Sequence, residues 1–249
     1  MLSLSVVVMT YNESKNIRKC LESISKISND TLVVDSYSTD DTVAIAKSLG
    51  ARIIEKEFAG YIKQRAFCVE QAEHDFILAL DADEWLSEEL IIEIQNIKSE
   101  FTHDCYTLNR LSRVGKYWIK HGTWHPQHIL RLFHKGKAIC SGKLPHDKII
   151  PIQNASVKKL KGKLLHQVNE DFADRIETIN RHSTTAAQTL SEGGGSPSLF
   201  RIVFKPFYRF INGYLFHLGL LDGKAGFFVC ITDAYYVFLR EMKLFELKS

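Results

Sequence analysis

The sequence predicts an α/β protein built on a mostly parallel sheet flanked by helices. Over the first hundred residues, short apolar runs alternate with segments of helical periodicity, which is the pattern of strands and crossover helices. Each apolar run passes directly into polar residues, as expected where the strands of an open sheet carry a binding site at their carboxyl ends. The content of 45% hydrophobic and 24% charged residues excludes a disordered chain.

The elements of this sheet follow from the spacing of the apolar residues. We expect strands over 4–9, 31–34, 52–55 and 76–80, and helices over 17–27, 43–49 and 61–72. A further helix begins after Ser87, because serine is a favoured N-cap residue, and a strand over 105–111 follows it.

The end of the chain is expected to form a separate region. A helix over 172–190 ends at the linker-like segment SEGGGSP, residues 191–197. The sequence therefore predicts a main domain over 1–192 and a helical C-terminal region over 197–249.

Charge is distributed unevenly along the chain. Residues 1–100 carry 10 Lys and Arg against 18 Asp and Glu, whereas residues 101–249 carry 22 against 11. This split favours an acidic or metal-coordinating first part and a second part that meets something anionic. The five cysteines are widely spaced without a CxxC pair, which argues against a disulfide framework or structural zinc and favours a reducing, cytoplasmic compartment.

The strongest local signal is the acidic segment Asp81-Ala82-Asp83-Glu84 after the strand over 76–80. Three carboxylates this close repel one another unless a cation lies between them. Such oxygen ligands favour Mg²⁺ or Mn²⁺, which take one or two protein carboxylates and complete their shell with water and phosphate. We expect Asp81 and Asp83 to share a face if the strand conformation continues. A solvated helix N-terminus is the alternative, although Ser87 already supplies a cap.

Asp35 stands at the end of the second strand, where a carboxylate can accept a hydrogen bond from a base or a ribose hydroxyl. The sequence has neither a GxGxxG segment after the first strand nor a GxxxxGK[ST] segment, so dinucleotide and P-loop phosphate binding are both disfavoured. A phosphate ligand would then depend on a metal ion and on side chains.

Taken in order, these motifs resemble those of the family 2 glycosyltransferases of the GT-A fold. The resemblance rests on VVVMTYNE (6–13), VVDSYSTDDT (33–42), the segment with Lys63 and Arg65, and LALDADE (78–84). Further along, HGTWHPQHILRLF (121–133), PHD (145–147) and LLH (164–166) are similar to bacterial lipopolysaccharide-core transferases that add β-linked glucose to an inner-core heptose. Those enzymes more usually carry His-Glu where this chain has His146-Asp147.

The resemblance implies a donor half, residues 1–100, that binds a UDP-sugar, and an acceptor half, residues 101–192. Its implied donor-site residues are Thr10, Tyr11, Glu13 and Asp35 around uridine, Lys63 near the phosphates or ribose, and Asp81 and Asp83 around Mg²⁺ or Mn²⁺ on the diphosphate. The ion would stabilise the leaving nucleoside diphosphate as its charge develops. Inversion at the anomeric carbon needs one in-line attack by an acceptor hydroxyl, and hence one general base.

Four further residues have expected roles. Asp147, on a predicted loop between strands, is the candidate base, and the alternative interpretation is that it is an ordinary turn aspartate. Glu84 is the alternative base. His166 is the candidate that closes the metal shell, against a purely structural histidine. Arg131 is expected to pair with phosphate or an anionic acceptor through its bidentate guanidinium.

The C-terminal region is rich in aromatic and basic residues. Residues 200–210 alternate aromatic residues with Arg201, Lys205 and Arg209, and residues 210–221 contain no charged residue. This pattern is typical of a membrane interface, with cations at the headgroups and aromatic rings below them. We therefore expect a peripheral protein on the cytoplasmic face of a bacterial inner membrane, with two ordinary helices packed on the main domain as the alternative.

The expected function is that of a metal-dependent, inverting transferase that moves a hexose, with glucose as the first candidate, from a UDP-sugar to a lipid-borne glycan such as the lipopolysaccharide inner core. Two other classes stay open. The basic second part with interleaved aromatic residues suits a nucleic-acid-binding protein, although the acidic strand ends weigh against a nucleic-acid partner. A sugar-nucleotide-binding protein without catalysis is the third class.

Overall fold

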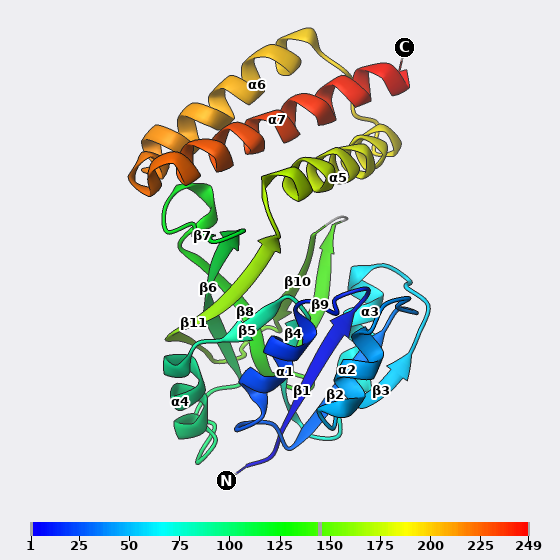
Figure 1. The fold of residues 1–249 in the computed structure, drawn as a ribbon, viewed down its shortest axis with the longest axis vertical. Coiled ribbons are helices and arrows are strands. Elements are labelled where there is room, and N and C mark those ends of the chain that lie inside the picture. The colour runs from blue at the N-terminus through cyan, green and yellow to red at the C-terminus, as the bar shows by residue number, and fades with distance from the viewer. Residues whose placement is uncertain (1, 144–145, 249) are drawn as a thin grey trace. The chain divides into compact units, whose positions relative to one another are not determined.

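The computed structural model describes residues 2–143 and 146–248, and leaves out the side chains of 143–147 (Figure 1). The chain forms two compact units. Unit 1 comprises Met1–Arg110 and Gln127–His166, and unit 2 comprises Leu111–Pro126 and Gln167–Ser249.

Unit 1 begins with a parallel sheet in the strand order β3-β2-β1-β4. These strands are β1 (Leu4–Thr10), β2 (Asp30–Asp35), β3 (Arg52–Glu55) and β4 (Phe76–Asp81), all paired in parallel. The helices α1 (Ile17–Ile24), α2 (Thr42–Ser48) and α3 (Tyr61–Glu70) connect them in chain order. These four strands and three helices confirm the elements predicted for this part of the sequence.

The later strands add an antiparallel part to the same sheet, which continues in the order β4-β8-β6-β11-β5. These strands are β8 (Gln127–His134), β6 (Cys105–Val114), β11 (Val157–Asn169) and β5 (Glu84–Leu86). Strand β8 runs antiparallel to β4 and β6, and β5 runs antiparallel to β11. The α/β class is confirmed, and the sheet is mixed because the strands after α4 (Glu88–Ile97) follow one another without the crossover helices that parallel pairing requires.

The two faces of the sheet are covered by separate apolar cores. Val6 and Val8 of β1 pack in one core with Ile17 of α1, whereas Val7 packs in the other core with Cys68 of α3. This division follows from the alternation of side chains along a strand. A strand buried on both faces reads as a continuous apolar run, which is why β1 was visible in the sequence.

Ser87 begins α4 as predicted, because its hydroxyl accepts a hydrogen bond from the Leu90 backbone N–H at 3.2 Å. A separate hairpin is formed by β9 (Ala138–Lys143) and β10 (His146–Pro151).

Unit 2 contains the short strand β7 (Tyr117–Trp118), paired with β6, and the three long helices α5 (Phe172–Glu192), α6 (Leu199–Ile211) and α7 (Gly223–Lys248). Both α5 and α6 pack along α7 (Figure 1). Arg175 of α5 bonds Asp233 of α7 at 2.6 Å, and Lys243 of α7 bonds the Asn180 side chain of α5 at 2.7 Å.

The two compact units are not divided at residue 192, and the predicted domain boundary stays a prediction. Helix α5 was expected in the main domain, but it shares a compact unit with α6 and α7 because its polar side chains bind α7 directly. Residues 111–126 also belong to unit 2, which the sequence did not indicate.

Across residues 2–143 and 146–248, no single helix is long and apolar enough to cross a membrane. Two consecutive helical segments, Leu199–Phe216 and Gly219–Lys248, satisfy the length and composition criteria together, with a bend of 74° between them.

Candidate functional site

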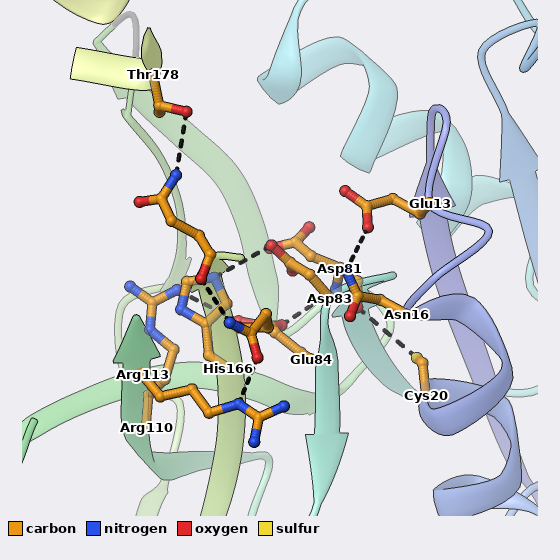
Figure 2. A network of polar contacts seen from close by, with 12 residues as sticks. Glu13, Asn16, Cys20, Asp81, Asp83, Glu84, Arg110, Arg113, His166 and Thr178 are labelled. Atoms are coloured by element: carbon orange, nitrogen blue, oxygen red, sulfur yellow. Dashed lines mark hydrogen bonds and ion pairs between the residues drawn. The ribbon is translucent and has the colours of Figure 1, made fainter. Parts of the chain in front are cut away.

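The predicted acidic segment lies in unit 1, at the carboxyl end of β4 (Figure 2). Asp81 is the last residue of β4, a turn contains Asp83, and Glu84 begins β5. Strand β5 pairs with β11 so that Glu84 stands opposite His166. The imidazole Nε2 of His166 lies 3.3 Å from Asp83 Oδ2, so the two predicted metal ligands meet.

Asp81 is held between two guanidinium groups. Its Oδ1 accepts a hydrogen bond from Arg65 at 2.8 Å, and its Oδ2 accepts one from Arg131 at 2.7 Å. Burial by itself raises the pKa of a carboxyl group, but the charges of Arg65 and Arg131 outweigh it and hold the pKa of Asp81 well below its usual range. Asp81 is therefore an ionised carboxylate whose two oxygens neutralise arginines.

Arg131 owes its position to a β-bulge. Tyr106 of β6 pairs with Leu132 of β8 and Thr107 pairs with Leu130, so the register skips Arg131. A bulge of this kind turns the side chain of the extra residue out of the regular alternation. In this structure the Arg131 Nη2 binds Asp81 and also lies 3.1 Å from Glu84 Oε1, and its pairing with phosphate or acceptor stays a prediction.

Glu84 is fully buried and neutralised. Its Oε1 lies 3.3 Å from Arg110 Nη1 and 3.1 Å from Arg131 Nη2, and its Oε2 accepts the Asp81 backbone N–H at 3.1 Å. A general base must reach the proton of an acceptor hydroxyl, and in this structure two guanidinium groups enclose the Glu84 carboxylate. Here Glu84 fixes the turn that carries Asp83, and its assignment as the alternative base stays a prediction.

Asp83 and His166 have the chemistry of a divalent cation site. Among the described residues, Asp83 Oδ1 is buried without a hydrogen-bond partner, while Oδ2 faces His166. Buried polar atoms are nearly always paired, so an orphaned carboxylate oxygen beside an imidazole is suited to an added cation. No cluster of three or more His, Cys, Asp or Glu suitable for a metal occurs in the described part of the chain. Two protein ligands still suit Mg²⁺ or Mn²⁺, which retain water and phosphate ligands.

The loops that follow β1 and β2 are tied together. The Asn12 backbone N–H donates to Ser38 Oγ at 2.8 Å, and the Thr39 backbone N–H donates to Asn12 Oδ1 at 2.8 Å. Asn12 and Tyr37 adopt left-handed φ angles of 53° and 62°. A left-handed backbone is costly for residues other than glycine and tends to occur at functional sites. The hydrogen bonds between the two loops therefore hold a specific backbone conformation.

The predicted uridine residues occupy different environments around these loops. Tyr11 is 57% exposed, and Thr10 is buried at the end of β1 with an Oγ1 that has no partner among the described residues. Glu13 accepts a hydrogen bond from the Asn16 side chain at 2.8 Å (Figure 2). Lys63 is exposed on α3.

Asp35 does not face solvent. It is fully buried, and its two oxygens accept hydrogen bonds from the Ser38 backbone N–H at 2.7 Å and the Ser38 hydroxyl at 2.5 Å. Asp35 therefore positions the loop after β2 in this structure, and its direct contact with a base or ribose stays a prediction.

Asp147 falls in β10, where the register places it opposite Gly142, and not on the loop that was expected. Its side chain lies outside the described residues.

Two arginines of the site escaped sequence reasoning. Arg65 was named only within a motif and Arg110 was not singled out, yet Arg65 binds Asp81 and Arg110 binds Glu84. A signal for Arg65 was present, because it lies three residues before Cys68 on the buried face of α3. A cation on an apolar helix face needs a buried carboxylate partner.

Comparison with known proteins identifies the family of this chain. The family described as Glycosyl transferase family 2 matches residues 5–160. The chain is 30% identical over 262 residues to the lipopolysaccharide core biosynthesis glycosyltransferase LpsC of Rhizobium meliloti (strain 1021), covering 98% of this chain and 93% of that protein. It is also 30% identical over 260 residues to an uncharacterised glycosyltransferase of Rickettsia prowazekii (strain Madrid E), covering 99% and 88%.

Among solved structures, the mannosyltransferase PcManGT from Pyrobaculum calidifontis, in complex with GDP-Man and Mn²⁺, is similar with a TM-score of 0.58 and 14% identity. The similarity covers 99% of this chain and 88% of that chain, and it shows the shared fold. The chain therefore belongs to glycosyl transferase family 2 and is a glycosyltransferase with the GT-A fold.

Proposed function

We propose that this enzyme is an inverting hexosyltransferase that uses Mg²⁺ or Mn²⁺ and transfers a hexose, with glucose as the first candidate, from a UDP-sugar to a lipid-borne glycan such as the lipopolysaccharide inner core. The observation that carries the proposal is the Asp83 carboxylate beside His166, with one buried oxygen left without a partner among the described residues. A diphosphate needs a cation at this edge of the sheet, since the sequence offers no glycine-rich phosphate loop.

The donor is proposed to lie across the carboxyl ends of β1 and β4. Tyr11 offers an exposed aromatic face to the base, and Thr10 offers a hydroxyl oxygen without a partner among the described residues. Lys63 is exposed and is assigned to the phosphates. Asp83 and His166 would hold the metal ion, which supplies positive charge to the departing diphosphate.

Asp147 is proposed as the general base. It would accept the proton of the acceptor hydroxyl while that oxygen bonds to the anomeric carbon and the bond from this carbon to UDP breaks. Attack on the face opposite UDP inverts the anomeric configuration. The Asp81 carboxylate keeps the charges of Arg65 and Arg131 neutralised beneath the site.

The lipid-borne acceptor is supported by the similarity to LpsC, whose name assigns it to lipopolysaccharide core biosynthesis. A lipid-borne acceptor requires the enzyme to work at a membrane surface. We propose a peripheral location on the cytoplasmic face of the inner membrane, through the outward face of α6.

That outward face, called here the α6 apolar face, has side chains between 53% and 70% exposed; it consists of Leu199, Phe200, Val203, Phe204, Phe207 and Tyr208. Two of the three cations of α6 are paired with α7: Lys205 bonds Glu241 at 2.9 Å and Arg209 bonds Asp233 at 3.0 Å. The apolar face itself suits the boundary between headgroups and acyl chains.

A thermal-shift panel tests the donor class. UDP-, GDP- and dTDP-sugars are added to the full chain with and without Mn²⁺, since a ligand that binds only the folded state raises its stability. We expect a UDP-sugar with Mn²⁺ to give the largest shift. A larger shift with GDP- or dTDP-sugars, or equal shifts without Mn²⁺, would overturn the proposed donor or its metal. Among the described residues, no observation favours a nucleic-acid-binding protein. Membership of a glycosyltransferase family favours an enzyme over a sugar-nucleotide-binding protein without catalysis.

A further inference from the structure

A cavity of about 420 Å³ lies within unit 2. Its walls come from the end of β6, the turn into β7, the end of β11 and the start of α5; they include Arg113, Lys116, Tyr117, Gln167, Glu170 and Phe172. The volume is in the range of small-ligand sites, which is roughly 300–1,000 Å³. The donor site of unit 1 uses none of these residues.

The lining of the cavity includes two aromatic rings. The rings of Tyr117 and Phe172 lie 6.2 Å apart between centroids with their planes at 39°. Phe172 is anchored, because it packs on Phe228 at 5.3 Å and against the apolar cluster around Val114 and Val229. Tyr117 is 44% exposed, and the Lys116 Nζ lies 5.6 Å from the centre of its ring.

The rim is polar and held in place. Arg113 donates its Nε–H to Gln167 Oε1, and its guanidinium lies 5.2 Å from the centre of the Trp118 ring. Gln167 donates from Nε2 to the Asn169 carbonyl at 2.5 Å. Since the Gln167 amide is bonded at both ends, its orientation is fixed before any ligand arrives, which lowers the entropic cost of binding.

The back wall depends on a close approach of two backbone segments. Gly115 has φ of 55°, and its N–H donates to the Asn169 carbonyl at 2.9 Å. A Cβ at this position would lie 3.1 Å from the Glu170 carbonyl oxygen. The turn therefore requires glycine, and it brings Lys116 and Glu170 to the same rim.

We propose that this cavity binds one pyranose residue of the glycan acceptor, and this proposal rests on the proposed function. A pyranose ring presents an apolar C–H face, which packs on an aromatic plane, together with hydroxyl groups that both donate and accept. Tyr117 supplies the plane, Arg113 and Lys116 supply donors, and Glu170 supplies an acceptor. The rim cations are matched by the carboxylates of Glu170 and Asp171, so the cavity suits an uncharged sugar better than a phosphate group.

The proposal is tested by calorimetric titration of the full chain. The titrant is the oligosaccharide obtained from lipopolysaccharide by deacylation. We expect Tyr117→Ala to weaken binding by about tenfold, because the stacking face is lost, and Tyr117→Phe to stay within about twofold. Glu170→Ala removes one rim acceptor and is expected to weaken binding severalfold. Tyr235→Ala, a change at an exposed tyrosine of α7, is the matched control and should bind like the wild type.

Circular dichroism of each variant checks folding. Equal affinity of the wild type, Tyr117→Ala and Glu170→Ala would overturn the proposal, as would lack of binding to the wild type. Slow hydrolysis of UDP-glucose by the wild type without any acceptor is measured separately. It reports the donor reaction, so a failure of the cavity and a failure of the proposed function give different results.

Discussion

His166 Nε2 lies 3.3 Å from Asp83 Oδ2, so a histidine of β11 and a carboxylate of the turn between β4 and β5 meet at one edge of the sheet. The pairing of β5 with β11 creates this contact, because it places Glu84 opposite His166. The remaining Asp83 oxygen, Oδ1, is buried and has no partner among the described residues, so it is available to bind a metal ion.

Metal binding is expected to depend on Asp83. Mn²⁺ together with UDP should raise the melting temperature of the wild type, because binding to the folded state contributes about 2.7 kcal/mol at 100 times Kd. Asp83→Asn should abolish the Mn²⁺-dependent part of the shift. Asp75→Asn changes an exposed carboxylate of the same unit and serves as the control. A full Mn²⁺ shift in Asp83→Asn would show that the ion binds elsewhere.

Arg131→Met is expected to destabilise the protein by about 3–5 kcal/mol, because it leaves the buried Glu84 and Asp81 carboxylates short of a counter-charge. Urea denaturation measures the loss. Arg18→Met is the matched control: its pair with Glu22 is on the surface, with both side chains more than half exposed, and such pairs contribute about 0–1 kcal/mol. Similar losses in the two variants would contradict the buried network.

Acid should weaken the connection between the loops after β1 and β2. Asp40 accepts hydrogen bonds from the Ser14 backbone N–H at 3.1 Å and from Thr42, both backbone N–H and hydroxyl. The slight burial raises the pKa of Asp40, but the hydrogen bonds from Thr42 and Ser14 outweigh it and lower the pKa to about 2. A carboxyl whose folded pKa is depressed stabilises the fold above its unfolded pKa, and this contribution is lost as pH falls towards the folded pKa.

The stability difference between wild type and Asp40→Asn should therefore be constant between about pH 7 and 5 and shrink from about pH 4 to 2. Thermal denaturation across this range measures it. Asp41→Asn is the control, since the Asp41 side chain makes no cap hydrogen bond to α2 within the described residues. A difference that stays constant down to pH 2 would refute the role of Asp40.

The α6 apolar face is expected to bind lipid. Phe204→Ser combined with Phe207→Ser should lower partitioning into phosphatidylglycerol-containing vesicles at least about tenfold, because two exposed aromatic side chains that enter the bilayer contribute several kcal/mol. Vesicle flotation measures the bound fraction. Ile92→Ser, at an exposed position of α4, is the control. Unchanged flotation of the double variant would contradict the proposal that the α6 apolar face binds the membrane.

The first part of the fold was predictable because its signals are local. Continuous apolar runs mark strands such as β1 and β4, and the Ser87 cap marks the start of α4. The acidic segment could also be assigned to a strand end. The sequence around the acidic segment did not reveal β5, because this strand has only three residues and is formed by pairing with β11.

Long-range contacts determine what the sequence could not predict. The partners of Glu84 and Asp81 come from α3, β6 and β8, and the bulge that aims Arg131 arises from the pairing register. In unit 2, the inward pairing of Lys205 and Arg209 depends on Glu241 and Asp233 of α7. Alternating aromatic and basic residues could not show which of them would face outward.

The proposed enzyme transfers a hexose from a UDP-sugar, and this transfer depends on a metal ion that Asp83 holds. The most direct measurement is UDP release from UDP-glucose in the presence of a deacylated lipopolysaccharide acceptor, for the wild type and Asp83→Asn, with Mn²⁺ or with EDTA. We expect release by the wild type with Mn²⁺, a loss of about 10²-fold or more in Asp83→Asn, and no release in EDTA. Full turnover by Asp83→Asn in EDTA would contradict it.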